Sequence, residues 1–210
     1  MAIAKKKKKF FDIDIPLIGK IGQARAFEIS ELDGKFLKYD LTRILRGKAT
    51  IFQGIIKADT KSAEVIPKKL QLMYYYLSRM VRKGTNYVED SFSAECKNAR
   101  LKIKPLLVTR KKVSRAVRKA LRNKCKEELT NYVKLLSAEQ VFDDILKNKL
   151  QKTLSAILKK IYPLSCCEIR VIQVENFLKE PAKPEKKEAG KKTEEKKEDK
   201  ATKKKVDKKE

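Results

Sequence analysis

The chain has 210 residues and carries 53 Lys and Arg against 27 Asp and Glu, a formal net charge of +26. It contains no histidine, which excludes Ser-His and Cys-His nucleophile pairs, HExxH metal sites and imidazole proton shuttles. An excess of one sign this large predicts a polyanionic partner and disfavours a free-standing enzyme. We therefore expect no catalytic residues, no cofactor and no small-molecule substrate.

The cysteines favour neither a metal site nor a disulfide. They show no CxxC spacing and lack histidine to complete a ligand set, and the adjacent pair Cys166-Cys167 could bridge only with strain. We expect reduced, partly buried thiols and no bound metal. No apolar run approaches the roughly 18 residues that span a bilayer, so we expect no membrane contact and a cytosolic or nuclear location.

Composition predicts three regions. Residues 1–20 are expected to form a basic N-terminal arm, and residues 21–179 a single α+β domain that holds nearly all the apolar residues. Residues 180–210 hold 13 Lys and 9 acidic residues, a net charge of +4, with Val206 as the only large apolar side chain. We expect this tail to be disordered, because it cannot bury enough surface to offset its ordering entropy.

Residues 21–110 are predicted to be rich in β-structure. Alternating apolar residues and turn signals suggest strands at 27–29, 36–41, 49–56, 70–76, 87–96 and 99–108. Gly54 predicts a break or bulge, and Pro105 a bulge or an exposed edge. A short helix should follow Leu77 and end at Gly84. We interpret the tyrosine run 74–76 as core packing in preference to base stacking.

Residues 111–162 are predicted to be helical. Apolar residues recur at three- and four-residue spacing over 113–133, with Ala116 and Ala120 in the stripe. The segment Ser137–Gln140 fits a capping box that opens a second helix, and a third should end before Pro163. A closing strand over 166–178 must return to the sheet to be buried.

The densest signal for function is the stretch 96–126, which contains 13 basic residues and no acidic one. An ordinary solvated helix mixes charges to gain i,i+4 pairs, so phosphates of a nucleic acid are the expected counter-charge. A merely soluble basic face and a membrane-surface helix are the alternatives. The candidate RNA-binding residues here are Lys102, Lys104, Arg110, Lys111, Lys112, Arg115, Arg118, Lys119 and Arg122. An N-terminal phosphate-binding arm adds Lys5, Lys6, Lys7, Lys8 and Lys9.

Four blocks resemble a known protein family in the family's order and at similar separations. They are Phe10-Phe11-Asp12-Ile13 with Pro16, Leu77 to Lys83, Leu107 to Lys112, and Ile161 to Leu164 followed by Ile169 to Val171. Together they resemble the archaeal and eukaryotic small-subunit ribosomal proteins of the S-one-e (S-three-A-e) family.

The resemblance implies a structural protein on the platform of the small ribosomal subunit, near the exit of the messenger RNA channel. Its partners would be rRNA near the 3′ end and neighbouring ribosomal proteins, in the cytoplasm. The implied fold is a β-barrel-like antiparallel sheet followed by packed helices and a returning C-terminal strand. The family also suggests RNA contacts from Arg79, Arg82 and Lys83. A general or chromatin-type nucleic-acid-binding protein is the first alternative, and an enzyme that acts on RNA is the second.

Overall fold

The computed structural model describes residues 7–59 and 62–177, and these ranges contain nine strands, one 3-10 helix and four α-helices. The first half of the chain forms β1 (Lys9–Ile15), β2 (Lys20–Ala26), η1 (Ile29–Leu32), β3 (Phe36–Asp40), β4 (Thr50–Ala58), β5 (Ala63–Leu72) and α1 (Tyr74–Met80). The second half forms β6 (Tyr87–Glu89), β7 (Phe92–Glu95), β8 (Ala99–Thr109), α2 (Arg115–Lys134), α3 (Ala138–Leu146), α4 (Lys149–Leu158) and β9 (Leu164–Phe177).

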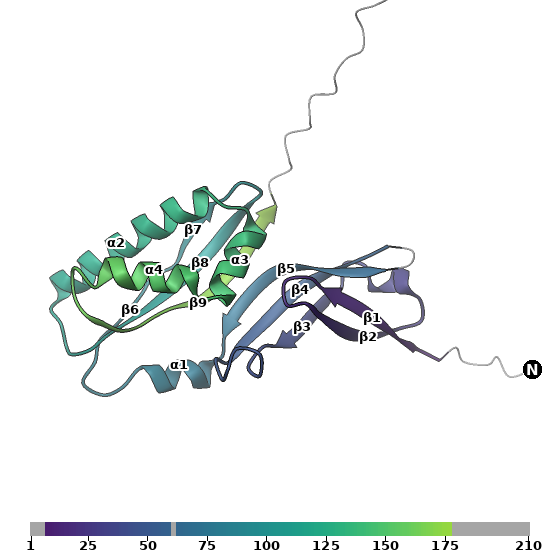
Figure 1. The fold of residues 1–210 in the computed structure, drawn as a ribbon, viewed down its shortest axis with the longest axis horizontal. Helices are drawn as coiled ribbons and strands as arrows, with labels where there is room; N and C mark the ends of the chain where they lie inside the picture. The colour runs from purple at the N-terminus through teal and green to yellow at the C-terminus, as the bar shows by residue number, and fades with distance from the viewer. Residues whose placement is uncertain (1–6, 60–61, 178–210) are drawn as a thin grey trace, which may run out of the picture. The chain divides into compact units, whose positions relative to one another are not determined.

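Strand β5 joins the two halves of the sheet (Figure 1). One edge of β5 pairs along its length with β4, which in turn pairs with β3. The other edge is shared, because β1 pairs in parallel at Glu64 and β9 pairs antiparallel at residues 69–71. Pro67, which has no N–H to donate, lies on β5 between these two pairings.

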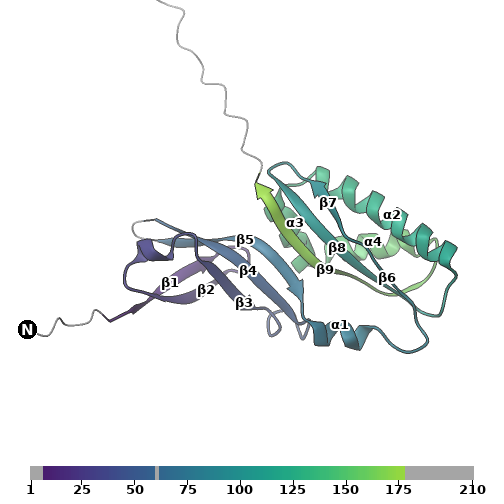
Figure 2. The same ribbon diagram turned by 180° about the vertical axis from the view of Figure 1, so that it is seen from behind.

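The strands of the first half form a curled sheet whose two edge strands approach each other. The end strands are β2 and β3, and a Cβ placed on Gly22 of β2 would lie 3.4 Å from the side chain of Leu37 on β3. In the second half, helices α2, α3 and α4 cover one face of the sheet formed by β6 to β9 (Figures 1 and 2). The α+β class is confirmed, with a mostly antiparallel sheet and a returning C-terminal strand.

The expected bulge at Gly54 is confirmed, although the extra residue belongs to the neighbouring strand. Gln53 faces Lys69 while Gly54 faces Pro67, so Lys68 of β5 is left over. A Cβ on Gly54 would collide with the side chain of Val65 and lie 2.8 Å from the carbonyl oxygen of Ile66. The backbones of β4 and β5 therefore approach closely only because residue 54 lacks a side chain.

We expect Gly54→Ala to lower the free energy of unfolding by about 1–3 kcal/mol, because the added methyl group overpacks a rigid backbone contact. Thermal and urea unfolding followed by circular dichroism would measure this loss. Gly22→Ala is the matched control, since its Cβ would make only ordinary van der Waals contacts, with no atom nearer than 3.4 Å. Equal stability of the two variants would contradict the proposed close approach.

The predicted arm over residues 1–20 is wrong for its second part. Residues 9–15 form β1, which pairs with β2 from Lys9↔Ala26 to Ile15↔Lys20. Ile13 and Ile15 are fully buried and alternate with Asp12 and Asp14, so this segment has the pattern of a strand with one face in the core. The tail 180–210 and residues 1–6 lie outside the described residues.

The strand expected at 27–29 is also wrong. Strand β2 ends at Ala26, and residues 29–32 turn into the 3-10 helix, where the Glu31 carboxylate accepts a hydrogen bond from the backbone N–H of Phe27. Only Leu32 of this helix is buried, and Phe27 is 38 % exposed. Two alternating apolar residues were too short a pattern to establish a strand.

Pro105 lies at a bulge in a central strand and not at an exposed edge. Lys104 faces Val171 of β9 and Pro105 faces Ile169, so Arg170 is the extra residue. On the other edge of β8, pairing with β7 stops at Ile103 and pairing with β6 starts at Leu106. The predicted strand 87–96 is therefore split in two at residues 90–91, where the proline offers no N–H to the ladder.

The helical half largely follows the expectation. Ser137 opens α3 with the predicted capping box, and its backbone N–H donates to Gln140 Oε1 at 3.1 Å. Helix α4 ends at Leu158, before Pro163, and Ile161 is 40 % exposed. Ala116 and Ala120 of α2 are exposed and do not belong to its core stripe. The four cysteines are free thiols, as expected.

Candidate nucleic-acid interface

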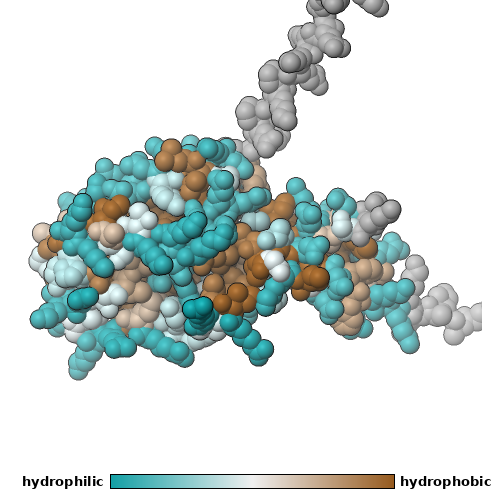
Figure 3. All heavy atoms as spheres, in the orientation of Figure 1, coloured by the Kyte–Doolittle hydropathy of each residue, from teal (hydrophilic) through white to brown (hydrophobic). Residues whose placement is uncertain are grey.

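Helix α2 carries a cationic stripe on its exposed side. The Ser114 side chain caps the helix by accepting a hydrogen bond from the backbone N–H of Val117. Leu121 and three later residues at four-residue spacing are buried and fix the helix against the sheet. The exposed basic residues at three- and four-residue spacing are Arg115, Lys119, Arg122 and Lys126. The face on which the helices lie is mostly hydrophilic, with separate apolar patches (Figure 3).

The stripe is most strongly cationic in its first turns. Lys124 forms ion pairs with Glu127 and Glu128, both at 3.1 Å, and these hydrogen bonds raise its pKa. Lys126 lies over the ring of Phe92, 5.8 Å from its centroid. The portion from Arg115 to Arg122 has no ion pair among the described residues, so its charge is available to a polyanion.

Arg118 differs from its neighbours on the helix. It is half-buried, and its Nε is covered without a hydrogen-bond partner among the described residues. The side chain therefore flanks the buried stripe and does not project with Arg115 and Lys119. The three- and four-residue spacing predicts that five basic residues lie opposite the apolar stripe, and Arg118 departs from this prediction. The five are Arg115, Arg118, Lys119, Arg122 and Lys126.

Two residues that sequence analysis missed fix the strand-to-helix junction that bears Arg110, Lys111 and Lys112. The hydroxyl of the fully buried Thr109 accepts from the backbone N–H of Asn86 at 3.1 Å and lies 2.8 Å from the Lys111 carbonyl oxygen, to which it can donate. The Asn86 side-chain oxygen accepts from the backbone N–H of Val113 at 3.1 Å. All three basic side chains are exposed, so partly buried hydrogen bonds hold the backbone while the charges face solvent.

The same contacts bring the predicted residues Arg82 and Lys83 towards this junction. Both are exposed and lie in the segment just before Asn86, where the Thr85 hydroxyl donates to the Arg82 carbonyl oxygen at 2.7 Å. Asn86 thus ties one basic segment to the other. In the sequence, the signal for this role was that Asn86, a polar residue, lies between the basic residues 82–83 and 110–112.

The tyrosine run lies on a helix, which corrects the expected strand and most of the expected core packing. Tyr74 and Tyr75 are 80 % and 46 % exposed, while Tyr76 is partly buried against the small cluster around Leu77. The guanidinium of Arg79 lies 5.4 Å from the ring centroid of Tyr75. In a helix three successive residues point in three directions, so at most one of them faces the core.

Lys102 and Lys104 do not share a face with α2. Their neighbours Leu101 and Ile103 are buried in the same cluster as Leu121, so strand alternation directs the two lysines to the opposite face of the sheet. Lys102 is also paired with Glu175 at 3.5 Å. The structure therefore divides the predicted RNA-binding residues between two faces.

Of the predicted lysine arm, Lys5 and Lys6 lie outside the described residues, and Lys9 is the first residue of β1. Lys8 lies over the ring of Phe27 at 5.3 Å. Two further exposed rings of the first half have basic partners that sequence analysis missed. Arg25 lies 5.9 Å from Phe10 and Lys68 lies 5.5 Å from Phe36.

The thiols and the acidic pair have structural surroundings. Burial raises the pKa of Cys125 to about 12 and that of Cys166 to about 11, which keeps both thiols protonated at neutral pH. Asp144 accepts a hydrogen bond from the Tyr132 hydroxyl at 2.8 Å, and Asp143 pairs with Lys147.

Within residues 7–59 and 62–177, no His, Cys, Asp or Glu cluster has a metal-binding arrangement. No helix in the described part of the chain is long and apolar enough to cross a membrane.

Comparison with known proteins gives a consistent family. The model of the Ribosomal S3Ae family matches residues 5–177. Small ribosomal subunit protein eS1 of Nanoarchaeum equitans (strain Kin4-M) is 26 % identical over 179 residues, which cover 81 % of this chain and 90 % of that protein. Proteins of the same name from Halorubrum lacusprofundi and Haloarcula marismortui are 29 % and 27 % identical over 121 residues, which cover 57 % of this chain and 55 % and 56 % of theirs. The family match takes in every described strand and helix.

Proposed function

Since this chain belongs to the Ribosomal S3Ae family, we propose that it is a structural constituent of the small ribosomal subunit that binds rRNA on the platform, near the messenger RNA exit. The family consists of structural ribosomal proteins, so the chain is not an enzyme. The neighbouring partners we propose are rRNA near the 3′ end and adjacent small-subunit proteins, with the cytoplasmic ribosome as the location.

The observation that carries the proposal is the continuous basic surface formed by the junction 110–112 and the first turns of α2. Hydrogen bonds of Thr109 and Asn86 hold the backbone of the junction, and the buried stripe of α2 holds the helix against the sheet. No acidic residue occurs from Cys96 to Lys126. Arginine side chains on a rigid helix suit phosphate oxygens because the guanidinium donates in a fixed fork.

We propose that this surface contacts RNA phosphates and sugars and reads shape more than base sequence, as is usual for folded RNA. The direct contacts would come from Arg110, Lys111, Lys112, Arg115, Lys119 and Arg122, with Arg118 flanking them. Arg79, Arg82 and Lys83 would extend the surface. Lys102 and Lys104 would meet a different RNA segment or a neighbouring protein, because they lie on the other face of the sheet. The lysines from Lys5 to Lys8, with Lys9 at the start of β1, would contact phosphate separately from this surface.

Sedimentation of native lysate tests this function. We expect the chain to migrate with small subunits on a sucrose gradient and to remain bound after a high-salt wash. Salt screens diffuse electrostatic attraction, whereas a specific interface is also held by other contacts. Antibody detection across the fractions measures this. Recovery at the top of the gradient, or release by modest salt, would instead support a general nucleic-acid-binding protein.

A further inference from the structure

A cleft of about 650 Å³ lies apart from the basic surface of α2. Its walls come from the loop 45–48, from Tyr76 on α1, from α4 and from the first residues of β9. This volume falls within the roughly 300–1,000 Å³ typical of sites for small ligands. None of the residues in these walls was predicted to bind RNA.

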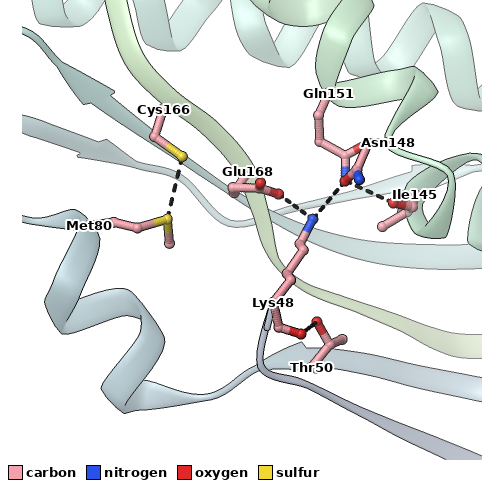
Figure 4. A network of polar contacts seen from close by, with 8 residues as sticks. All are labelled: Lys48, Thr50, Met80, Ile145, Asn148, Gln151, Cys166 and Glu168. Carbon is pink, nitrogen blue, oxygen red and sulfur yellow. Dashed lines mark hydrogen bonds and ion pairs between the residues drawn. The ribbon is translucent and has the colours of Figure 1, made fainter. Parts of the chain in front are cut away.

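The cleft has a fixed, electrically balanced floor (Figure 4). Lys48 Nζ donates to Glu168 Oε2 at 2.6 Å and to Asn148 Oδ1 at 2.9 Å, and the two charged side chains are 12 % and 15 % exposed. These bonds join the loop to the start of α4 and to β9, which lie 100 and 120 residues further along the chain. Because Lys48 and Glu168 neutralise each other, the floor attracts neither sign strongly.

The rim of the cleft, in contrast, is cationic. Arg46, Lys152 and Lys159 line it and are exposed, and none forms an ion pair within the described part of the chain. Arg46 and Asn148 both adopt the left-handed backbone conformation, with φ of 53° and 57°. Non-glycine residues are uncommon there, and such conformations concentrate at ligand sites.

The wall also contains an unsatisfied acceptor. Gln151 is 5 % exposed, and its amide nitrogen donates to the Ile145 carbonyl oxygen at 3.0 Å. Its Oε1 has no donor among the described residues. This oxygen has almost no exposed surface, so it lies behind the wall of the cleft and does not face the solvent.

We infer that the cleft holds one unpaired nucleotide of the rRNA, with the base inside and the flanking phosphates on the rim. The inference rests on the proposed function. Tyr76 offers a ring for stacking, and burial, with the nearby Glu168 carboxylate, raises its pKa, so its hydroxyl remains a neutral donor. The hydroxyl groups of Ser155 and Ser165 can pair with base edges, and the three rim cations match phosphate charge.

Filling the cleft without changing its charge tests the inference. Ala156→Trp places a large ring in the cleft from an exposed position of α4, and Thr153→Trp adds the same ring to the same helix outside the cleft lining. Each variant is assembled into small subunits and the rRNA is probed by 2′-hydroxyl acylation. We expect one to three nucleotides to become at least threefold more reactive with Ala156→Trp than with wild type or Thr153→Trp, while subunit incorporation stays unchanged.

Unchanged reactivity in Ala156→Trp subunits would overturn the cleft assignment and leave the ribosomal role intact. Failure of the wild-type chain to enter subunits would instead overturn the proposed function itself. If Ala156→Trp does not fold, Ala156→Glu replaces it and repels the flanking phosphates, and the same nucleotides should be exposed. A cleft occupied by a neighbouring protein would give no nucleotide change in either variant, which also contradicts the inference.

Discussion

The charge-reversal variant Arg115→Glu/Lys119→Glu/Arg122→Glu is expected to weaken binding to small-subunit rRNA by on the order of 1,000- to 10,000-fold at physiological salt. Each exposed side chain is proposed to contact phosphate, and each loss removes a charge-assisted contact of roughly 1.5 kcal/mol and adds repulsion. The dependence of log K on log salt should also flatten by about two to three units, since about three fewer counterions are released. Filter binding across a salt series measures both effects.

A matched control separates this surface from the net charge. Lys35→Glu/Lys38→Glu/Lys57→Glu changes the charge equally at exposed residues of the first half. We expect it to lose much less affinity and to keep most of the salt dependence. Both variants should melt like wild type, because all six positions are exposed. Equal losses of affinity would show that binding follows total charge and not the α2 surface. Arg118 is left unchanged because its Nε is buried.

Lys48→Met is expected to lower the free energy of unfolding by about 3–5 kcal/mol, because it leaves the largely buried Glu168 carboxylate without its charged partner. For a domain of this size such a loss corresponds to a fall in melting temperature of roughly 10 °C. The pair also joins the loop 45–48 to β9, so the junction between the two halves of the sheet should loosen. Urea unfolding followed by circular dichroism measures the loss.

Two companion variants make this result specific. Lys48→Met/Glu168→Met should return close to wild-type stability, because replacing both charges removes the desolvation cost of each. Lys147→Met breaks the exposed pair with Asp143, where the side chains are 56 % and 40 % exposed, and should change stability by less than about 1 kcal/mol. A loss for Lys48→Met no larger than for Lys147→Met would mean that the first pair does not stabilise the fold.

Periodicity predicted most helices and several strands, because each of these patterns extends over many residues. The stripe of α2, the capping box at Ser137 and the bulge opposite Gly54 all followed from local sequence. Short patterns failed. The tyrosine run could alternate as a strand or turn as a helix, and only the packing of Leu77 and Tyr76 into one cluster selected the helix.

The candidate interface was predicted as a list of residues but not as a surface. The basic residues of 96–126 were evident, whereas their division between two faces depends on which side of β8 the helices cover. Thr109 and Asn86 were missed because they bear no charge, and their role depends on hydrogen bonds between segments 23 residues apart. Thus the density of charge in the sequence identified the segment, and packing decided which charges lie on the same face.

The sequence by itself determined the polyanionic partner, the family and the α+β class, since composition, ordered motifs and long periodic patterns are properties of the chain. Only the tertiary structure decided that β1 belongs to the sheet, that Arg118 is half-buried with its Nε covered, and that loop 45–48, α4 and β9 line a cleft. The physical reason is distance along the chain. Lys48 meets Glu168 across 120 residues, and no local pattern records a contact whose partners are brought together only when the whole sheet forms.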